Sequence, residues 1–259
     1  MVYFIATPIG NLAEITFRAV ETLKSVEAIF CEDTRHSQIL LNHYGISKPL
    51  YSYHKFNEKK SLDFVLSFCE KGRDVAVISD AGMPSINDPG NVLVNALKEK
   101  NYPYTVISGA SAFVNAFVLS GYKPPFTYYG FLPDKKSERD KLLDGAVGVA
   151  IFYVSVHDIK ENMRYLCERL GNRECCLVKE LTKTHEKATF CHLSDVIDDD
   201  KGEFVLVVNT ATELNPLCEL TVTQHLDYYI KGGMSKSEAV KAVAKDRNVP
   251  KNEIYKQTL

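Results

Sequence analysis

Residues 78–90 read Ile-Ser-Asp-Ala-Gly-Met-Pro-Ser-Ile-Asn-Asp-Pro-Gly, and the predicted fold is organised around this loop. The apolar run Val75–Ile78 predicts a buried strand, and the segment from Pro89 onward has helical periodicity. Gly82 lets a ligand approach the backbone closely, and Asp80 can accept hydrogen bonds from hydroxyl groups. Small molecules bind at the carboxyl ends of strands in such crossovers, so we expect a ligand here. Taken alone, such a loop is more often a plain surface turn.

The first half of the chain alternates β-rich runs with helical periodicity, which is typical of a parallel sheet wrapped by helices. Strands are expected at residues 2–7, 28–31, 75–79 and 104–107, and helices at 15–26, 36–44, 59–71, 89–100 and 111–119. The proline-rich stretch that follows interrupts this pattern. We therefore place a domain boundary there, which makes residues 1–121 an N-terminal α/β domain.

The second half has more strand character and a less regular order, which favours a mixed sheet. Strands are expected at 149–154, 175–181, 189–193 and 204–208, with a helix at 159–170. These elements make residues 122–214 a second α/β domain. Residues 215–259 then read as a small helical module, with helices at 221–230, 236–247 and 251–258.

Bulk composition excludes several classes of protein. The 259 residues are 45% hydrophobic and carry a net charge of −2, so nucleic acid could be held only by a local basic patch. The seven cysteines show no paired spacing for zinc, and we expect free thiols in the cytoplasm. No stretch approaches the ~20 apolar residues that span a bilayer, so we expect no membrane. No cluster of His, Cys and Asp suggests a metal.

Charged residues follow two of the expected strands. Glu32, Asp33 and Arg35 come after the strand at 28–31, and Glu180 and Lys183 close a later one. Asp33, or the threonine after it, is a natural helix N-cap, which explains that position without any function. Capping does not explain why Glu32 and Arg35 are charged. Catalytic groups are common at the ends of strands, so these two positions favour a function. We expect a functional role for the first cluster, whereas the second alone is a weak signal.

The C-terminal module combines an apolar helix face with a basic one. Such a basic face suits a phosphate backbone, although a solvated capping module is about as good an interpretation from the charges alone. The lysines expected to contact RNA are Lys236, Lys241, Lys245 and Lys251.

An ordered set of motifs carries a family resemblance. They are Thr-Pro-Ile-Gly-Asn-Leu at 7–12, Glu-Asp-Thr-Arg at 32–35, Ser-Asp-Ala-Gly-x-Pro at 79–84, Asn-Asp-Pro-Gly at 87–90, Phe-Tyr at 152–153, Glu-Leu-Thr-Lys at 180–183 and Gly-Glu at 202–203. Together they closely resemble the ribosomal small subunit methyltransferase I family of the tetrapyrrole methylase superfamily, over nearly the whole chain. The resemblance implies two α/β domains with S-adenosylmethionine in the cleft between them, and a homodimer. It also implies 2'-O-methylation of a cytidine ribose in the decoding region of 16S rRNA.

The resemblance also implies roles for individual residues. The positions expected to hold the cofactor are Ile9, Gly10, Asp80, Gly82, Met83, Ser111, Ala112, Tyr153 and Leu181. The candidates for the proton acceptor or its organiser are Glu32, Asp33 and Glu180. Arg35, Lys179 and Lys183 would grip phosphates or stabilise an oxyanion. Nothing in the sequence ranks these candidates.

Two other functions remain open on the same fold. One is a tetrapyrrole (precorrin-type) methylase, against which the basic tail argues because a porphyrinoid substrate needs none. The other is an RNA-binding or assembly protein that has lost catalysis. It is motivated by Val154 and Asp158, which stand where the family usually has Glu and Arg.

Overall fold

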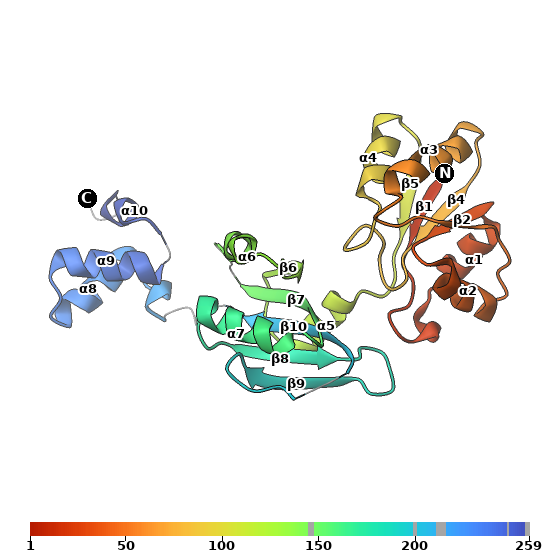
Figure 1. The fold of residues 1–259 in the computed structure, drawn as a ribbon. Helices are drawn as coiled ribbons and strands as arrows, with labels where there is room; N and C mark the ends of the chain where they lie inside the picture. The colour runs from red at the N-terminus through yellow and green to blue at the C-terminus, as the bar shows by residue number, and fades with distance from the viewer. Residues whose placement is uncertain (145–147, 199–200, 211–215, 248, 257–259) are drawn as a thin grey trace.

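The computed structural model describes residues 1–144, 148–198, 201–210, 216–247 and 249–256. These residues form two five-stranded sheets with covering helices and a separate cluster of C-terminal helices (Figure 1). None of the helices in these ranges is long and apolar enough to cross a membrane.

The first sheet is wholly parallel, as predicted, with strand order β3-β2-β4-β1-β5. Its strands are β1 Val2–Ile5, β2 Ala28–Cys31, β3 Leu50–Ser52, β4 Val75–Ile78 and β5 Tyr104–Ile107. Its helices are α1 Phe17–Ser25, α2 Thr34–His43, α3 Glu58–Glu70 and α4 Asn91–Glu99, with a short 3-10 turn at Leu12–Glu14. Because all five strands run the same way, their carboxyl ends meet at one edge of the sheet.

Helices cover both faces of this sheet. Phe30 on β2 packs with α3 and α4 residues, whereas its neighbour Ile29 packs with α1 and α2 residues on the other face. With both faces covered, β2 and β4 are buried at every position. This is why their sequences read as continuous apolar runs.

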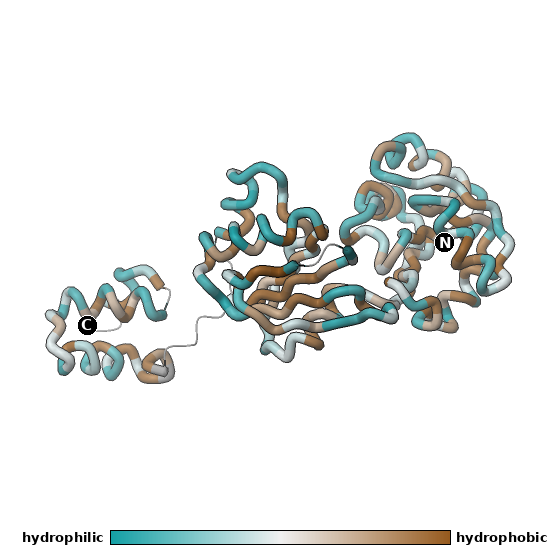
Figure 2. Tube along the Cα trace, turned by 60° about the horizontal axis from the view of Figure 1, so that its bottom comes forward, coloured by the Kyte–Doolittle hydropathy of each residue, from teal (hydrophilic) through white to brown (hydrophobic). Residues whose placement is uncertain are grey.

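The second sheet is mixed, as predicted, with strand order β6-β7-β10-β8-β9 and only β6 and β7 running parallel. Its strands are β6 Phe126–Phe131, β7 Val149–Ser155, β8 Glu174–Lys179, β9 Lys187–His192 and β10 Glu203–Asn209. Its helices are α6 Lys136–Leu143 and α7 Ile159–Leu170. Figure 2 shows the hydrophobic strands at the centre of this unit. Helix α5, Ala112–Ser120, packs on β7, β8 and β10, although it follows the last strand of the first sheet.

The C-terminal helices have their own small core. Helix α8 (Val222–Lys231), α9 (Lys236–Asp246) and α10 (Lys251–Lys256) bury Leu226, Val240, Val243 and Ile254 among themselves. Capping boxes start the first two of these helices, with Ser235 and Glu238 exchanging side-chain and backbone hydrogen bonds at α9. The module is therefore stabilised locally.

The structure corrects several predicted elements. Strands β3 and β6 and helix α6 were not predicted, and α1 begins at Phe17 instead of Ile15. Pro89 lies outside α4, whose N-cap is Gly90. The division into residues 1–121, 122–214 and 215–259 stays a prediction. Its second boundary lies outside the described residues, and α5 contacts the second sheet from before the first boundary.

Gly90 provides a test of how tightly the loop at 80–90 is held. Its φ is +149°, its N–H donates to Glu58 Oε1 at 2.8 Å, and an added Cβ would lie 1.8 Å from Ser85 Oγ. We expect Gly90→Ala to destabilise the fold by roughly 1–3 kcal/mol more than Gly72→Ala, because the loop must shift. Gly72 is the matched control, since it also has a positive φ (+68°) but has nothing within 4 Å of an added Cβ. Urea unfolding measures the free energy of unfolding of both variants. Equal losses of stability would contradict a tightly held loop at 80–90.

Candidate functional site

A cavity of about 500 Å³ lies where the carboxyl edge of the first sheet faces the second unit. Its first wall comes from loops that follow β1, β4 and β5, and its second wall from β6, β7, β10 and the loop after β8. The lining residues are Ile9, Ala81, Gly82, Met83, Ile86, Asn87, Asp88, Ser111, Ala112, Phe131, Tyr153, Val154, Ser155, Val156, His157, Leu181, Gly202, Glu203, Phe204 and Val205. The volume is typical of a small-molecule site.

Backbone hydrogen bonds clamp two loops of the first wall together. Thr7 N–H donates to the Gly82 carbonyl at 2.9 Å, and Gly82 N–H donates to the Thr7 carbonyl at 3.1 Å. The buried Thr7 hydroxyl also donates to the Ser79 carbonyl at 3.0 Å. Gly82 has a φ of +80°, a conformation that a residue with a Cβ rarely adopts. The glycine is therefore needed for the clamp.

At Gly10 the loop after β1 packs closely against the loop after β8. An added Cβ there would lie 2.6 Å from Lys183 Cγ and 3.0 Å from the Leu181 carbonyl oxygen. The loop after β1 therefore reaches the second unit only because this position has no side chain.

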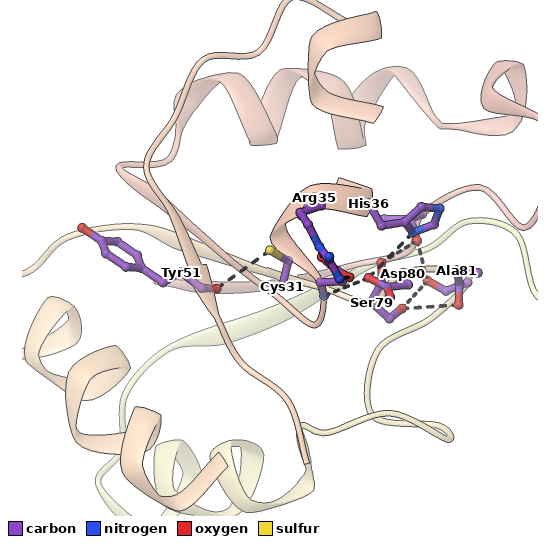
Figure 3. A network of polar contacts seen from close by, with 10 residues as sticks. Cys31, Arg35, His36, Tyr51, Ser79, Asp80 and Ala81 are labelled. Carbon is purple, nitrogen blue, oxygen red and sulfur yellow. Dashed lines mark hydrogen bonds and ion pairs between the residues drawn. The ribbon is translucent and has the colours of Figure 1, made fainter. Parts of the chain in front are cut away.

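Three carboxylates, those of Glu32, Asp80 and Asp88, gather at the first wall, and Asp88 lines the cavity. Burial raises the pKa of Glu32, and the nearby charges of Asp88 and Asp80 raise it further. Burial also raises the pKa of Asp88. Asp80 Oδ1 accepts a hydrogen bond from Asp33 N–H at 3.1 Å and lies 3.8 Å from His36 Nδ1 (Figure 3). Asp80 thus ties the ends of β2 and β4 together.

Asp33 and Arg35 are bound to each other. Asp33 is the N-cap of α2, which confirms one of the two positions predicted for the cap. Its Oδ1 accepts a hydrogen bond from the Arg35 N–H at 2.8 Å. Arg35 Nη2 also donates to Asp33 Oδ2 at 2.7 Å, and these hydrogen bonds hold the Asp33 pKa far below its usual range. The Arg35 side chain is 90% exposed, so its guanidinium remains accessible to a large ligand.

A strained loop with an ion-pair cluster forms part of the second wall. Glu180 and Thr182 have positive φ values of +50° and +67°, and Leu181 between them lines the cavity. The Glu203 N–H donates to Glu180 Oε1 at 2.8 Å, which is the main cause of a lowered Glu180 pKa. Lys183 Nζ contacts Glu180 at 3.1 Å and Glu203 at 2.9 Å.

The structure places most of the predicted cofactor positions in the cavity wall. Seven of the nine line it, namely Ile9, Gly82, Met83, Ser111, Ala112, Tyr153 and Leu181. Gly10 and Asp80 lie beside the lining and hold its loops. The five predicted catalytic residues do not line the cavity but form two groups next to it. Glu32, Asp33 and Arg35 stand at the end of β2, and Glu180 and Lys183 adjoin the lining residue Glu203.

Sequence reasoning missed some residues of the wall. Asp88 and Asn87 belong to the Asn-Asp-Pro-Gly motif, which was recognised as part of the family pattern but given no role. Phe131 lies on β6, in the stretch predicted to be irregular, so no strand pattern drew attention to it. Among the described residues, no three His, Cys, Asp or Glu side chains are arranged to hold a metal ion.

The C-terminal module gathers exposed lysines around a second, shallow hollow. Lys241, Lys245 and Lys251 line it together with Val249 and Pro250. Lys236, the first residue of α9, is exposed but does not line the hollow. Three of the four predicted lysines therefore share one surface.

Residues 1–197 match the profile of the Tetrapyrrole (Corrin/Porphyrin) Methylases. Ribosomal RNA small subunit methyltransferase I of Bacillus subtilis (strain 168) is 39% identical over 270 residues, covering 98% of this chain and 92% of the relative. The protein of the same name from Mycoplasmopsis pulmonis (strain UAB CTIP) is 48% identical over 213 residues, covering 80% and 96%.

A solved structure with the same fold is uroporphyrin-III C-methyl transferase from Thermus thermophilus, complexed with S-adenyl homocysteine. Its TM-score is 0.58 at 16% identity, over 81% of this chain and 97% of that one. This likeness shows the fold, and the sequence matches confirm the predicted resemblance. The chain belongs to the ribosomal RNA small subunit methyltransferase I family of the tetrapyrrole methylases.

Proposed function

We propose that this chain uses S-adenosylmethionine to methylate the 2'-oxygen of a cytidine ribose in the decoding region of 16S rRNA. The cavity between the two units carries the proposal, because seven residues predicted to bind S-adenosylmethionine line it. The names of the relatives support the RNA substrate, and the S-adenyl homocysteine bound to the structural relative supports the cofactor.

The residues of the cavity fit this cofactor. Ile9, Ala112 and Leu181 offer apolar surface to a planar base. The lining contains the carboxylates of Asp88 and Glu203 and, within the described part of the chain, no Lys or Arg, which suits a ligand with sulfonium and ammonium cations.

When bound, S-adenosylmethionine would supply an electrophilic methyl group on its sulfonium. The contribution of the chain would be to hold the ribose hydroxyl in line with that methyl group and to accept the hydroxyl proton. Arg35 is an exposed cation that follows β2 and would hold a phosphate of the target strand.

Hydrogen bonding favours Glu32 among the three candidate proton acceptors. Asp33 is occupied by Arg35 and by its own helix, and Glu180 is occupied by Glu203 N–H and Lys183. Glu32 is partly buried, and its carboxylate accepts no hydrogen bond from another described residue. Its raised pKa makes it a better proton acceptor than an ordinary carboxylate.

Calorimetry with S-adenosylmethionine and mapping of 2'-O-methyl groups on small-subunit RNA test the proposal. We expect saturable binding and one methylated cytidine. Binding without transfer would favour the assembly-protein alternative, and transfer to a porphyrinoid but not to RNA would favour a tetrapyrrole methylase.

The role of Glu32 predicts a specific pH dependence. A proton acceptor works when deprotonated, so kcat should rise with pH through the pKa of Glu32, which lies above the ordinary value of 4.5. Glu32→Gln should lower kcat by about 10²–10⁴-fold and leave cofactor affinity unchanged. Asp88→Asn removes a neighbouring negative charge, so the acidic limb of the profile should move to lower pH.

Asp33→Asn is the control for this prediction, because Asn caps a helix about as well as Asp and the charges that raise the Glu32 pKa are those of Asp88 and Asp80, so the acidic limb should stay in place. A Glu32→Gln enzyme with normal kcat would remove Glu32 from the reaction.

The basic hollow predicts a salt-dependent contribution to RNA binding. Replacing Lys241, Lys245 and Lys251 together by Gln should weaken RNA binding and reduce its salt slope by about 2–3 units, roughly one for each phosphate that is no longer neutralised. Cofactor affinity should not change. The control is Lys98→Gln with Lys100→Gln, which alters exposed lysines at the end of α4. Equal salt slopes for both variants would leave the module as a structural cap.

A homodimer is supported by exposed apolar residues on the edge strand β5 and on α5. Val106 is 52% exposed and Val118 is 71% exposed, so both side chains are available to contact a second copy of the chain. We expect Val118→Glu to shift the protein from dimer to monomer in sedimentation equilibrium. Val196→Glu is the control, at a position 83% exposed on the second unit. A chain that is monomeric without substitution would refute the proposal.

A further inference from the structure

The two walls of the cavity are joined by side chains as well as by backbone. Asn87 lies on the loop after β4, in the first unit, and Tyr153 lies on β7, in the second. Both line the cavity, whereas Tyr128 on β6 does not line it and lies in contact with both. The three side chains come from segments far apart in the sequence.

Tyr128 connects these two lining residues through its hydroxyl and its ring. Asn87 Nδ2 donates a hydrogen bond to the Tyr128 hydroxyl at 2.7 Å. The rings of Tyr128 and Tyr153 also pack edge to face, with centroids 5.1 Å apart and planes at 68°. Side-chain contacts therefore run from Asn87 on one wall through Tyr128 to Tyr153 on the other.

The surrounding residues fix the Tyr128 ring. It stacks on Phe113 of α5 at 4.3 Å between centroids and 23° between planes. The register of β6 with β7 shifts between Tyr128 and Gly130, and such bulges re-aim side chains. Gly130 also leaves room for the amide, because an added Cβ would lie 3.1 Å from Asn87 Oδ1. The stacking on Phe113, the bulge in β6 and the space at Gly130 together place the Tyr128 hydroxyl within hydrogen-bonding distance of Asn87.

We propose that Tyr128 is a positioning residue whose hydroxyl latches the loop at 80–90 to β6 of the second sheet and so sets the separation of the cavity walls. The part of this inference that concerns the cofactor rests on the proposed function. A neutral hydrogen bond at this partly exposed position can break and re-form, so the latch can release when a ligand enters or leaves.

Hydrogen exchange in the ligand-free protein tests the latch without any assumption about the ligand. In Tyr128→Phe the ring stacking remains and the hydroxyl is removed, so amides in residues 82–88 should exchange about 3–10-fold faster. Tyr129→Phe is the matched control. The Tyr129 ring packs on the other face of the second sheet, where it stacks on Phe152 with 5.1 Å between centroids. Amide exchange in the Tyr129→Phe variant should therefore match that of the unsubstituted protein. Unchanged exchange in Tyr128→Phe would overturn the proposal.

Calorimetry and kinetics then test positioning. We expect the Kd and KM for S-adenosylmethionine to rise about 3–10-fold in Tyr128→Phe, with kcat nearly unchanged. Asn87→Ala combined with Tyr128→Phe should be no worse than Asn87→Ala alone, because both remove the same hydrogen bond. Additive effects, or a fall in melting temperature with no change in Kd, would overturn the proposal. If the unsubstituted protein binds no S-adenosylmethionine, the proposed function fails, and the exchange experiment still decides the latch.

Discussion

The cavity depends on the paired backbone hydrogen bonds between Thr7 and Gly82. They join the loops that follow β1 and β4, which are neighbouring strands of the first sheet, at a point where both segments have left the sheet. A third hydrogen bond from the buried Thr7 hydroxyl fixes the same corner. Because the bonds use backbone atoms, the side chain of Ile9 remains free to line the cavity. The corner of the first wall at Thr7 and Gly82 is thus fixed by hydrogen bonds within the chain.

The second wall reaches a comparable rigidity through strain. The positive φ values of Glu180 and Thr182 each cost about 1–3 kcal/mol, and they persist only if surrounding contacts hold them. Those contacts are the Glu203 N–H and Lys183, both of which bind Glu180. The carboxylate of Glu180 therefore has a structural explanation that its position in a motif did not reveal. Leu181 is aimed into the cavity as the consequence of this arrangement.

The sequence predicted elements with strong patterns and missed those with weak ones. Strands β2 and β5 and helix α7 have the predicted bounds, because apolar runs or a helical stripe mark them clearly. The three-residue β3 is too short for a pattern, and β6 follows two prolines. Helix α6 buries only Leu143 within its span, so it lacks an apolar stripe. In each case tertiary contacts, absent from local sequence, decide the structure.

The same limit applies to the site. Motifs located most of the cavity wall, because glycines and small residues after strands mark close backbone approach. They could not show that Asp80 faces the N–H of Asp33, since that contact joins residues 47 positions apart. They also could not rank Glu32, Asp33 and Glu180. The ranking depends on which carboxylates already accept hydrogen bonds, and only the folded chain determines that.

The distribution of charge separates two binding tasks. Carboxylates at and behind the cavity favour a small cationic ligand, and the same charges would repel a phosphate backbone. A polyanion must therefore be held by cations outside the cavity, and the chain provides them in the exposed Arg35 and in the lysines of the C-terminal hollow. Because attraction falls off within about 10 Å at moderate salt, these separated patches can act on RNA although the net charge is −2. Local charge, and not the net charge of the chain, then decides what each surface can bind.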